Sequence, residues 1–327
     1  MHIPDNYLSP ETCTVMAAAA LPVLAISIYK VKKELPVEKV SVLGVGAAFS
    51  FLVMMFNIPL PGGTTGHAVG GTLIAMLLGP YAACISITVT LILQAFLFGD
   101  GGILSLGANI FNIAIVLPFT GYFVYQLCCK FLRGEKREWI AGGIGSYIGI
   151  NAAAFCAGVE FGIQPMLFHD AAGNALYCPY PLSVSIPAMM LGHLTILGIA
   201  EVVFTIAMYA FIQSSAPQML IRTEKTKSPI ALRLLLAALI CAVPIGLLAE
   251  GTAWGEWSKE ELQSFQHGIL PAGMQQGMTW HSFLPEYSLS GMPAWLSYIL
   301  SAAIGASLCV IVFKLLSSHG KKAHHEA

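Results

Sequence analysis

Charged residues are scarce in this chain. Asp, Glu, Lys and Arg make up 10% of its 327 residues, whereas soluble domains carry roughly 25%. Hydrophobic residues account for 56% of the chain, and the mean hydropathy is +0.74. The net charge is -1, so there is no excess of basic residues with which to bind nucleic acid. This composition excludes an ordinary soluble domain and predicts a protein embedded in a membrane.

Several motifs of catalytic and metal-binding proteins are also missing. The eight cysteines form no CxxC pair and lie mostly in apolar runs, so we expect neither a disulfide framework nor a thiolate metal site. The sequence has no HExxH motif, the signature of many metalloproteases. It also has no GxxxxGKS/T loop, so this chain cannot hydrolyse ATP with a P-loop. We therefore expect a protein that is not an enzyme.

The chain contains long, continuous apolar stretches. A membrane-spanning helix needs about 20 such residues, whereas transmembrane β-strands show short alternating segments. The stretches therefore predict an all-α, polytopic integral membrane protein. They lie at about 13–30, 40–58, 68–79, 81–98, 103–129, 139–162, 183–213, 230–249 and 294–316.

The third stretch is short and leaves two interpretations open. Residues 68–98 are compatible with two short helices or with one kinked helix, because Gly79-Pro80 interrupts them. The Gly-Asp-Gly-Gly sequence at 99–102 predicts a turn before the next stretch. This turn favours three crossings of the membrane between residues 68 and 129.

The distribution of basic residues predicts the orientation of the chain. Loops rich in Lys and Arg remain in the cytoplasm. If the N-terminus lies outside, Lys259 is the only one of the 16 basic residues on the outer side. We therefore expect the N-terminus outside.

The polar segment 214–229 predicts a boundary between two units. Before it, residues 1–213 are expected to form a seven-helix core. After it, residues 230–327 are expected to form a module of two helices joined by a long external loop at 250–293. The segment 214–229 itself is expected to be a cytoplasmic linker.

The first ten residues, MHIPDNYLSP, suggest a metal site. They lack the basic and apolar stretches of a secretory signal, so we expect them to belong to the mature protein. The amine of Met1, with the backbone nitrogen and imidazole of His2, can close two fused chelate rings around one ion. His67, in PGGTTGHAVGG, is the candidate for a fourth nitrogen. Such a square of nitrogens suits Ni²⁺ or Cu²⁺, and similar ligands hold Co²⁺. The alternative interpretation is that both histidines are ordinary exposed residues.

Four further polar residues lie in or near the apolar stretches. His193 and Glu201 occupy one predicted span, where ionisable groups are rare and face a cavity or a partner. They are candidates for supporting the metal site or for a helix–helix hydrogen bond. Asn109 and Asn112 are three residues apart and share a helix face. They are candidates for orienting His67 or for joining two helices.

Together, four segments resemble the CbiM/NikM family, the substrate-binding membrane (S) components of energy-coupling factor (ECF) transporters for cobalt and nickel. They are MHIPDNYLSP, PGGTTGHAVGGTL, LILQAFLFGDGGILSLGANIFNIAIV and the run from Gly192 to Glu201. The resemblance covers essentially all of 1–213. It implies that a metal ion is held by the Met1 amine, by the amide nitrogen and imidazole of His2, and by His67. The module, which contains GTAWGEWSKEEL, resembles the companion subunit CbiN/NikN, here fused to the core.

The resemblance implies a function and partners. The chain is expected to capture Co²⁺ or Ni²⁺, as the transported substrate, at an external site in a bacterial or archaeal cytoplasmic membrane. Import would be driven by ATP hydrolysed on two cytoplasmic ATPase subunits, which an ECF coupling (T) membrane protein connects to this chain. The alternative is an autonomous secondary transporter or channel for divalent cations. That function would need carboxylates along the bundle, and only Glu160 and Glu201 lie in or near a core span. The residues do not distinguish cobalt from nickel, and they do not define the role of the module.

Overall fold

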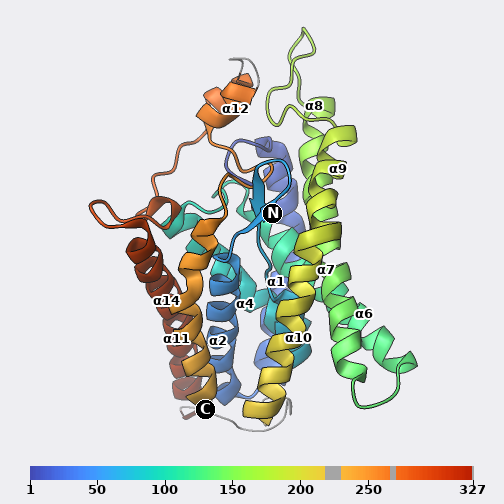
Figure 1. The fold of residues 1–327 in the computed structure, drawn as a ribbon, viewed down its shortest axis with the longest axis vertical. Coiled ribbons are helices and arrows are strands. Elements are labelled where there is room, and N and C mark those ends of the chain that lie inside the picture. Colours follow the sequence, from blue (N-terminus) through green and yellow to red (C-terminus); the bar gives the residue numbers. More distant parts are fainter. Residues whose placement is uncertain (218–229, 266–269, 326–327) are drawn as a thin grey trace.

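The computed structural model of the protein describes residues 1–217, 230–265 and 270–325. Most of the expected linker, including Arg222, Lys225 and Lys227, lies outside the described residues. The described chain is a bundle of helices with one small β-hairpin (Figure 1). Seven of its helices are long and apolar enough to cross a membrane. The prediction of an all-α, polytopic membrane protein is confirmed.

Seven helical segments form the described part of the core. They are α1 (Pro10–Glu34); α2 (Val37–Met54); α3 (Gly71–Leu78); α4 (Pro80–Leu93) with its extension η1 (Gln94–Phe98); α5 (Leu106–Asn109), which continues through η2 (Ile110–Val116) into α6 (Leu117–Phe131); α7 (Arg137–Gly162), followed by the single turn α8 (Gln164–Leu167); and α9 (Leu182–Gly192), which continues through η3 (His193–Leu197) into α10 (Gly198–Ser215). The segments η1, η2 and η3 are π-helical turns.

The chain folds back on itself at Gly79, between α3 and α4. Gly79 has φ = 95°, a backbone conformation that favours glycine, and Pro80 then occupies the first turn of α4, where its missing N–H is tolerated. Gly79 and Pro80 line one cleft with Lys30, near the end of α1. The far end of α4 leads to Asp100, which lies beside His2 near the chain start. Residues 68–98 therefore form two helices that run in opposite directions rather than one kinked helix.

A β-hairpin that the apolar pattern did not predict precedes α3. Strands β1 (Ile58–Leu60) and β2 (Thr64–Gly66) pair in antiparallel register, with Pro59 opposite Thr65. The turn between them contains Gly62 and Gly63, both with positive φ. Strands of three residues are too short to give a readable alternation. The hairpin delivers His67 into the end of the bundle that also holds Met1 and His2, which we call the Met1 end.

The C-terminal module packs on the core rather than forming a separate hairpin. Its elements are α11 (Ile230–Ala242), η5 (Val243–Leu248), α12 (Lys259–Phe265), α13 (Ala272–Gln275), η6 (Pro285–Tyr287) and α14 (Ala294–His325). Helix α14 lies along α2, so closely that a Cβ on Gly44 would be 3.1 Å from the Cα of Val310. The hydroxyl of Tyr298 also donates to the carbonyl of Met55 at 2.9 Å. The external loop crosses the Met1 end (Figure 1).

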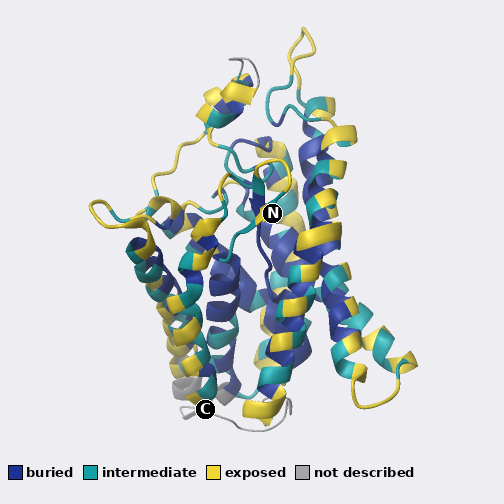
Figure 2. Cartoon of the chain, viewed as in Figure 1, coloured by how far each residue is buried: buried dark blue, intermediate teal, exposed yellow. Residues whose placement is uncertain are grey.

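The start of the chain is buried inside the Met1 end. Met1, His2 and Ile3 are 4%, 1% and 0% exposed, although terminal residues usually lie at the surface. Buried residues concentrate on the inward faces of the helices, while exposed residues lie on the outside (Figure 2). Many of the exposed side chains are large and apolar, such as Val15 and Leu21 on α1. These outward apolar faces are suited to lipid contact.

Close packing between α1 and α5 generates a prediction. A Cβ added to Gly107 would lie 2.6 Å from the Cα of Ala17, so there is no room for a larger side chain at the contact. Ala17→Leu should lower the free energy of unfolding by about 1–3 kcal/mol through overpacking. Ala18→Leu adds the same atoms at the next residue, which is exposed, and should have little effect. Thermal unfolding of the detergent-solubilised protein measures both, and equal midpoints would contradict this packing.

Candidate metal centre

The amide of Asn109 holds the first residues in place. Its oxygen accepts the backbone N–H of Ile3 at 2.8 Å, and its nitrogen donates to the carbonyl of Ile3 at 3.0 Å. The same carbonyl accepts the N–H of Gly102 at 2.9 Å. A Cβ on Gly102 would lie 2.7 Å from the carbonyl carbon of Pro4, so only glycine permits this approach. These contacts fix the segment that carries His2.

His2 presents ring nitrogens that no hydrogen bond satisfies. The side chain is 1% exposed, and neither Nδ1 nor Nε2 has a hydrogen-bond partner. Nδ1 does lie 3.1 Å from Oδ1 of Asp100, a close contact that is not aligned as a hydrogen bond. Buried polar atoms nearly always have partners. A buried imidazole with two unpartnered nitrogens is therefore suited to binding a ligand.

His67 lies next to His2, with one nitrogen free. The centres of the two rings are 5.1 Å apart. Nδ1 of His67 donates to the carbonyl of Ala68 at 3.1 Å, so the lone pair of the neutral ring is on Nε2, which is buried and unpartnered. Burial lowers the pKa of His67 well below its ordinary value, and the positive Met1 amine and His2 lower it further. His67 is therefore neutral at physiological pH, the form that binds metal ions.

Glu201 supports the segment that follows His67. Its carboxylate accepts the N–H of Val69 at 2.7 Å and that of Gly70 at 3.0 Å. Both backbone groups belong to the non-helical stretch before α3, inside the bundle, where an unpartnered N–H would be costly. The hydrogen bonds from Val69 and Gly70 to Glu201 thus hold in place the loop that carries His67.

The remaining candidates differ in their placement. His193 is buried, its Nδ1 lies 2.7 Å from the carbonyl of Met189, and it lines one cleft with Met1. Asn112 donates to Glu160 at 2.8 Å. The sequence offers Asn109 and Asn112 as candidates for orienting His67 or for joining two helices. Asn109 forms hydrogen bonds with Ile3, next to His2, and Asn112 forms one with Glu160 of α7.

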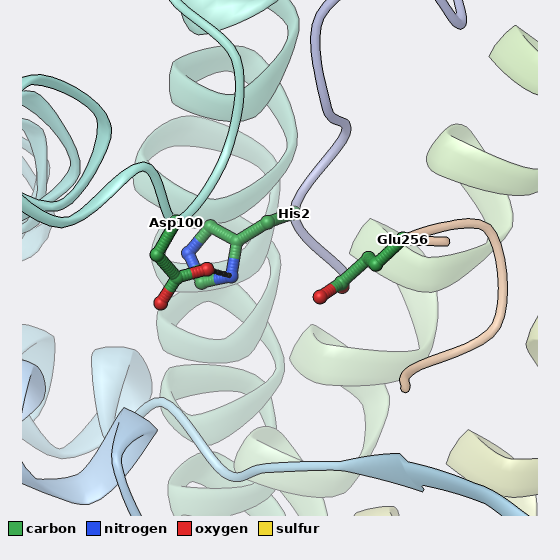
Figure 3. A group of neighbouring side chains, drawn as sticks. All are labelled: His2, Asp100 and Glu256. Carbon is green, nitrogen blue, oxygen red and sulfur yellow. Dashed lines mark ion pairs between the residues drawn. The ribbon is translucent and has the colours of Figure 1, made fainter. Parts of the chain in front are cut away.

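Two carboxylates at the centre were not among the sequence candidates. Oε1 of Glu256 accepts the Met1 amine at 2.8 Å, and Asp100 lies against His2 (Figure 3). The sequence carried only weak signals for them. Asp100 stands in the Gly-Asp-Gly-Gly turn, and Glu256 stands between a glycine and a tryptophan in the external loop. Turn and loop residues give no periodicity from which to infer a position in space.

The three π-helical turns of the described residues each contain or adjoin a polar residue discussed above. Asp100 follows η1, Asn112 stands within η2, and His193 begins η3. Single π-helical turns occur frequently at functional sites, because the extra residue re-aims the side chains after it. Their association with these residues supports a functional role for the Met1 end.

Fold and site together define a multi-pass helical membrane protein with a buried, nitrogen-rich centre at one end of its bundle. Residues 2–219 match the CbiM family, described as the cobalt uptake substrate-specific transmembrane region. The chain belongs to this family. Residues 228–321 match the PDGLE domain, so a second domain follows the first in the same chain.

Two relatives match nearly the whole length of this chain. The chain is 46% identical over 334 residues to the "Probable fused nickel transport protein LarMN" of Lactiplantibacillus plantarum, covering 99% of this chain and 100% of the relative. It is 45% identical over 330 residues to the "Fused nickel transport protein NikMN" of Rhodobacter capsulatus, covering 95% of each. A solved structure described as a truncated transition metal transporter is 51% identical, with a TM-score of 0.62, over 65% of this chain and 99% of that one. The relatives are transport proteins rather than enzymes.

The two hydrogen bonds between Asn109 and Ile3 generate a second prediction. Asn109→Ala removes two hydrogen bonds, each worth about 0.5–1.5 kcal/mol. It leaves the buried N–H of Ile3 without a partner, while the carbonyl of Ile3 still accepts the N–H of Gly102. The amide of Ile3 should then exchange with deuterium about 10-fold faster or more, as measured by mass spectrometry of the N-terminal peptide. Asn174→Ala, which removes an exposed amide in the loop before α9, should leave this exchange unchanged. Unaltered protection in Asn109→Ala would contradict the role of Asn109.

Proposed function

We propose that the chain captures Ni²⁺ or Co²⁺ at the Met1 end and delivers it across the cytoplasmic membrane as the substrate-specific component of an ATP-driven ECF-type transporter. Membership of the CbiM family supports a role in metal uptake. The two fused relatives are named as nickel transport proteins, so Ni²⁺ is the first ion to test.

One observation carries the proposal: unpartnered nitrogen ligands meet in a buried place. His2 lies in the segment held by Asn109, and His67 lies in the loop held by Glu201. Their rings are 5.1 Å apart, and both have nitrogens without partners. The Met1 amine lies at the same end, paired with Glu256. Met1, His2 and His67 thus supply the nitrogen donors that Ni²⁺ and Co²⁺ accept.

The chemistry of these donors makes a free amine essential. The amine of Met1 and the backbone nitrogen of His2 close one five-membered chelate ring, and that nitrogen and Nδ1 of His2 close a second ring of six atoms. Before it binds, the amine must release a proton, and so must the amide. His67 supplies the fourth nitrogen. Loading therefore releases protons, and acid pH opposes it.

Transport requires energy that this chain does not supply. It carries no P-loop motif, so the proposed partners are an ECF coupling (T) membrane protein and two cytoplasmic ATPase subunits. The proposed orientation has the Met1 end outside. The loop between α6 and α7, which carries Arg133 and Lys136, lies at the opposite end of the bundle from the chain start (Figure 1), where the positive-inside rule favours the cytoplasm.

The alternative function, an autonomous transporter or channel for divalent cations, has less support. It would need carboxylates free to line a path through the bundle. The described core has two intramembrane carboxylates. Glu201 accepts backbone N–H groups of the His67 loop, and Oε2 of Glu160 accepts a hydrogen bond from Asn112, which leaves Oε1 of Glu160 as the one oxygen of this pair without a partner. A single unpartnered oxygen does not form a path of carboxylates through the bundle.

The role of the amine generates the third prediction. Adding two glycines before Met1 moves the amine too far along the chain to close a chelate with the nitrogens of His2 and should weaken Ni²⁺ binding by about 100-fold or more, equivalent to about 2.7 kcal/mol. Isothermal calorimetry of the detergent-solubilised protein, with Co²⁺, Cu²⁺ and Zn²⁺ for comparison, measures the affinity. A short extension at the C-terminus is the control and should have no effect.

His67 provides a second test of the same donor set. His67→Ala removes the fourth nitrogen and should also weaken Ni²⁺ binding strongly. His169→Ala removes an exposed histidine from an outer loop and should bind like the native protein. Tight binding by both the extended protein and His67→Ala would refute the proposed coordination.

The energy source generates the fourth prediction. Cells that express this chain with the coupling protein and both ATPases should accumulate ⁶³Ni, because ATP hydrolysis drives release of the bound ion inward. Cells that express the chain alone, or with an ATPase whose P-loop lysine is replaced, should accumulate only background amounts. Equal uptake without active ATPases would favour the autonomous transporter.

A further inference from the structure

A second group of possible ligands lies beside the nitrogen donors. His2, Asp100 and Glu256 approach one another so that one ligand atom from each lies within 4.8 Å of the others (Figure 3). The three side chains come from separate parts of the chain: the N-terminal segment, the turn after η1 and the external loop of the module. Their convergence is a product of the tertiary fold.

The two carboxylates are more exposed to solvent than His2. The Asp100 side chain is 20% exposed and that of Glu256 is 17% exposed, whereas His2 is 1% exposed. An ion that approaches from solution therefore meets carboxylate oxygens before it meets imidazole nitrogens. The unpartnered nitrogens of His2 point to a ligand that the protein itself does not provide.

Each carboxylate is held so that an oxygen faces the site. Oδ2 of Asp100 accepts the hydroxyl of Tyr287 at 2.5 Å and the amide of Gln94 at 3.3 Å. This arrangement directs Oδ1 toward His2. Glu256 accepts the Met1 amine, the only cationic group to which an ion pair joins it in the described residues. A divalent cation can take the place of that ammonium group beside Glu256.

The external loop that carries Glu256 is fastened to the centre on both sides. Thr64 of the hairpin donates its hydroxyl to the carbonyl of Thr252 at 3.0 Å, and Thr65 forms an isolated β-bridge with Ala253. The hydroxyl of Tyr7 donates to the carbonyl of Trp257 at 2.9 Å. Glu256 is thus fixed between anchored residues, as a ligand must be.

We propose that Asp100, Glu256 and His2 form a second, oxygen-rich site that takes a partly hydrated divalent cation from solution and passes it to the nitrogen donors. Carboxylates suit ions that keep some of their bound water, whereas imidazole suits Ni²⁺ after it has lost that water. The two sites share His2, so one ion occupies them in turn. The module supplies Glu256 directly and holds Asp100 through Tyr287. This inference rests on the proposed function.

Mn²⁺ is the probe that isolates this second site, because it prefers carboxylate and water ligands. The experiment uses full-length protein with a native N-terminus and the His67→Ala substitution, which leaves the nitrogen set incomplete. Electron paramagnetic resonance measures free Mn²⁺ during titration. We expect His67→Ala to bind one Mn²⁺. Adding Glu256→Gln or Asp100→Asn should weaken this binding at least 10-fold.

Glu260→Gln is the matched control. It removes the same charge from the same loop, at an exposed residue, and should leave Mn²⁺ binding unchanged. If Glu256 only anchors the amine, its substitution will leave Mn²⁺ binding unchanged as well, and the proposal is wrong. Failure of His67→Ala to bind Mn²⁺ also overturns it. Thermal unfolding shows whether a variant is misfolded. If Glu256→Gln is misfolded, Mn²⁺ binding by the Asp100→Asn variant tests the proposal instead, because Asp100 belongs to the core.

The loading rate of the otherwise native protein separates this proposal from the proposed function. Stopped-flow quenching of tryptophan fluorescence, with Trp257 beside Glu256, follows Ni²⁺ entry. Glu256→Gln should slow loading at least 10-fold, within the range by which local charge changes association rates, while Glu260→Gln should not. Unchanged loading overturns the second site alone. Absence of tight Ni²⁺ binding by the native protein overturns the proposed function instead.

Discussion

The burial of the chain start depends on one side chain, the amide of Asn109. It bonds both backbone groups of Ile3. Without Asn109, the buried N–H of Ile3 would have no partner, at a cost of about 1–3 kcal/mol. Because Ile3 is fixed, Met1 and His2 are held inside the bundle rather than left to move as a free end. The cluster at the Met1 end exists only while this segment stays docked.

Glu201 holds the His67 loop in place through backbone hydrogen bonds, as Asn109 holds the chain start. Each polar side chain is placed in an apolar bundle and bonds to backbone groups of a non-helical segment. Asn109 and Glu201 therefore provide hydrogen-bond partners for the backbone of these segments. Both ring nitrogens of His2 and Nε2 of His67 are left without hydrogen-bond partners. A site of this kind is preorganised, because its ligands are positioned by residues that do not themselves bind the ion.

The C-terminal module is structurally part of the same centre. Helix α14 packs along α2, and two parts of the external loop reach the Met1 end through Glu256 and Tyr287. This arrangement gives a physical reason for two units to share one chain. When the loop is covalently joined to the core, its high effective concentration keeps it docked over the site.

The sequence by itself determined the class of fold and the main ligand candidates. Apolar stretches long enough to span a membrane are local features, and so is a histidine beside the first amine, so both could be read without coordinates. Only the tertiary structure decided that Asn109 bonds Ile3 rather than His67, that α14 lies on α2, and that Asp100 and Glu256 meet at His2. These contacts join residues far apart in the chain. They depend on how helices pack and loops dock, which no local pattern of residues encodes.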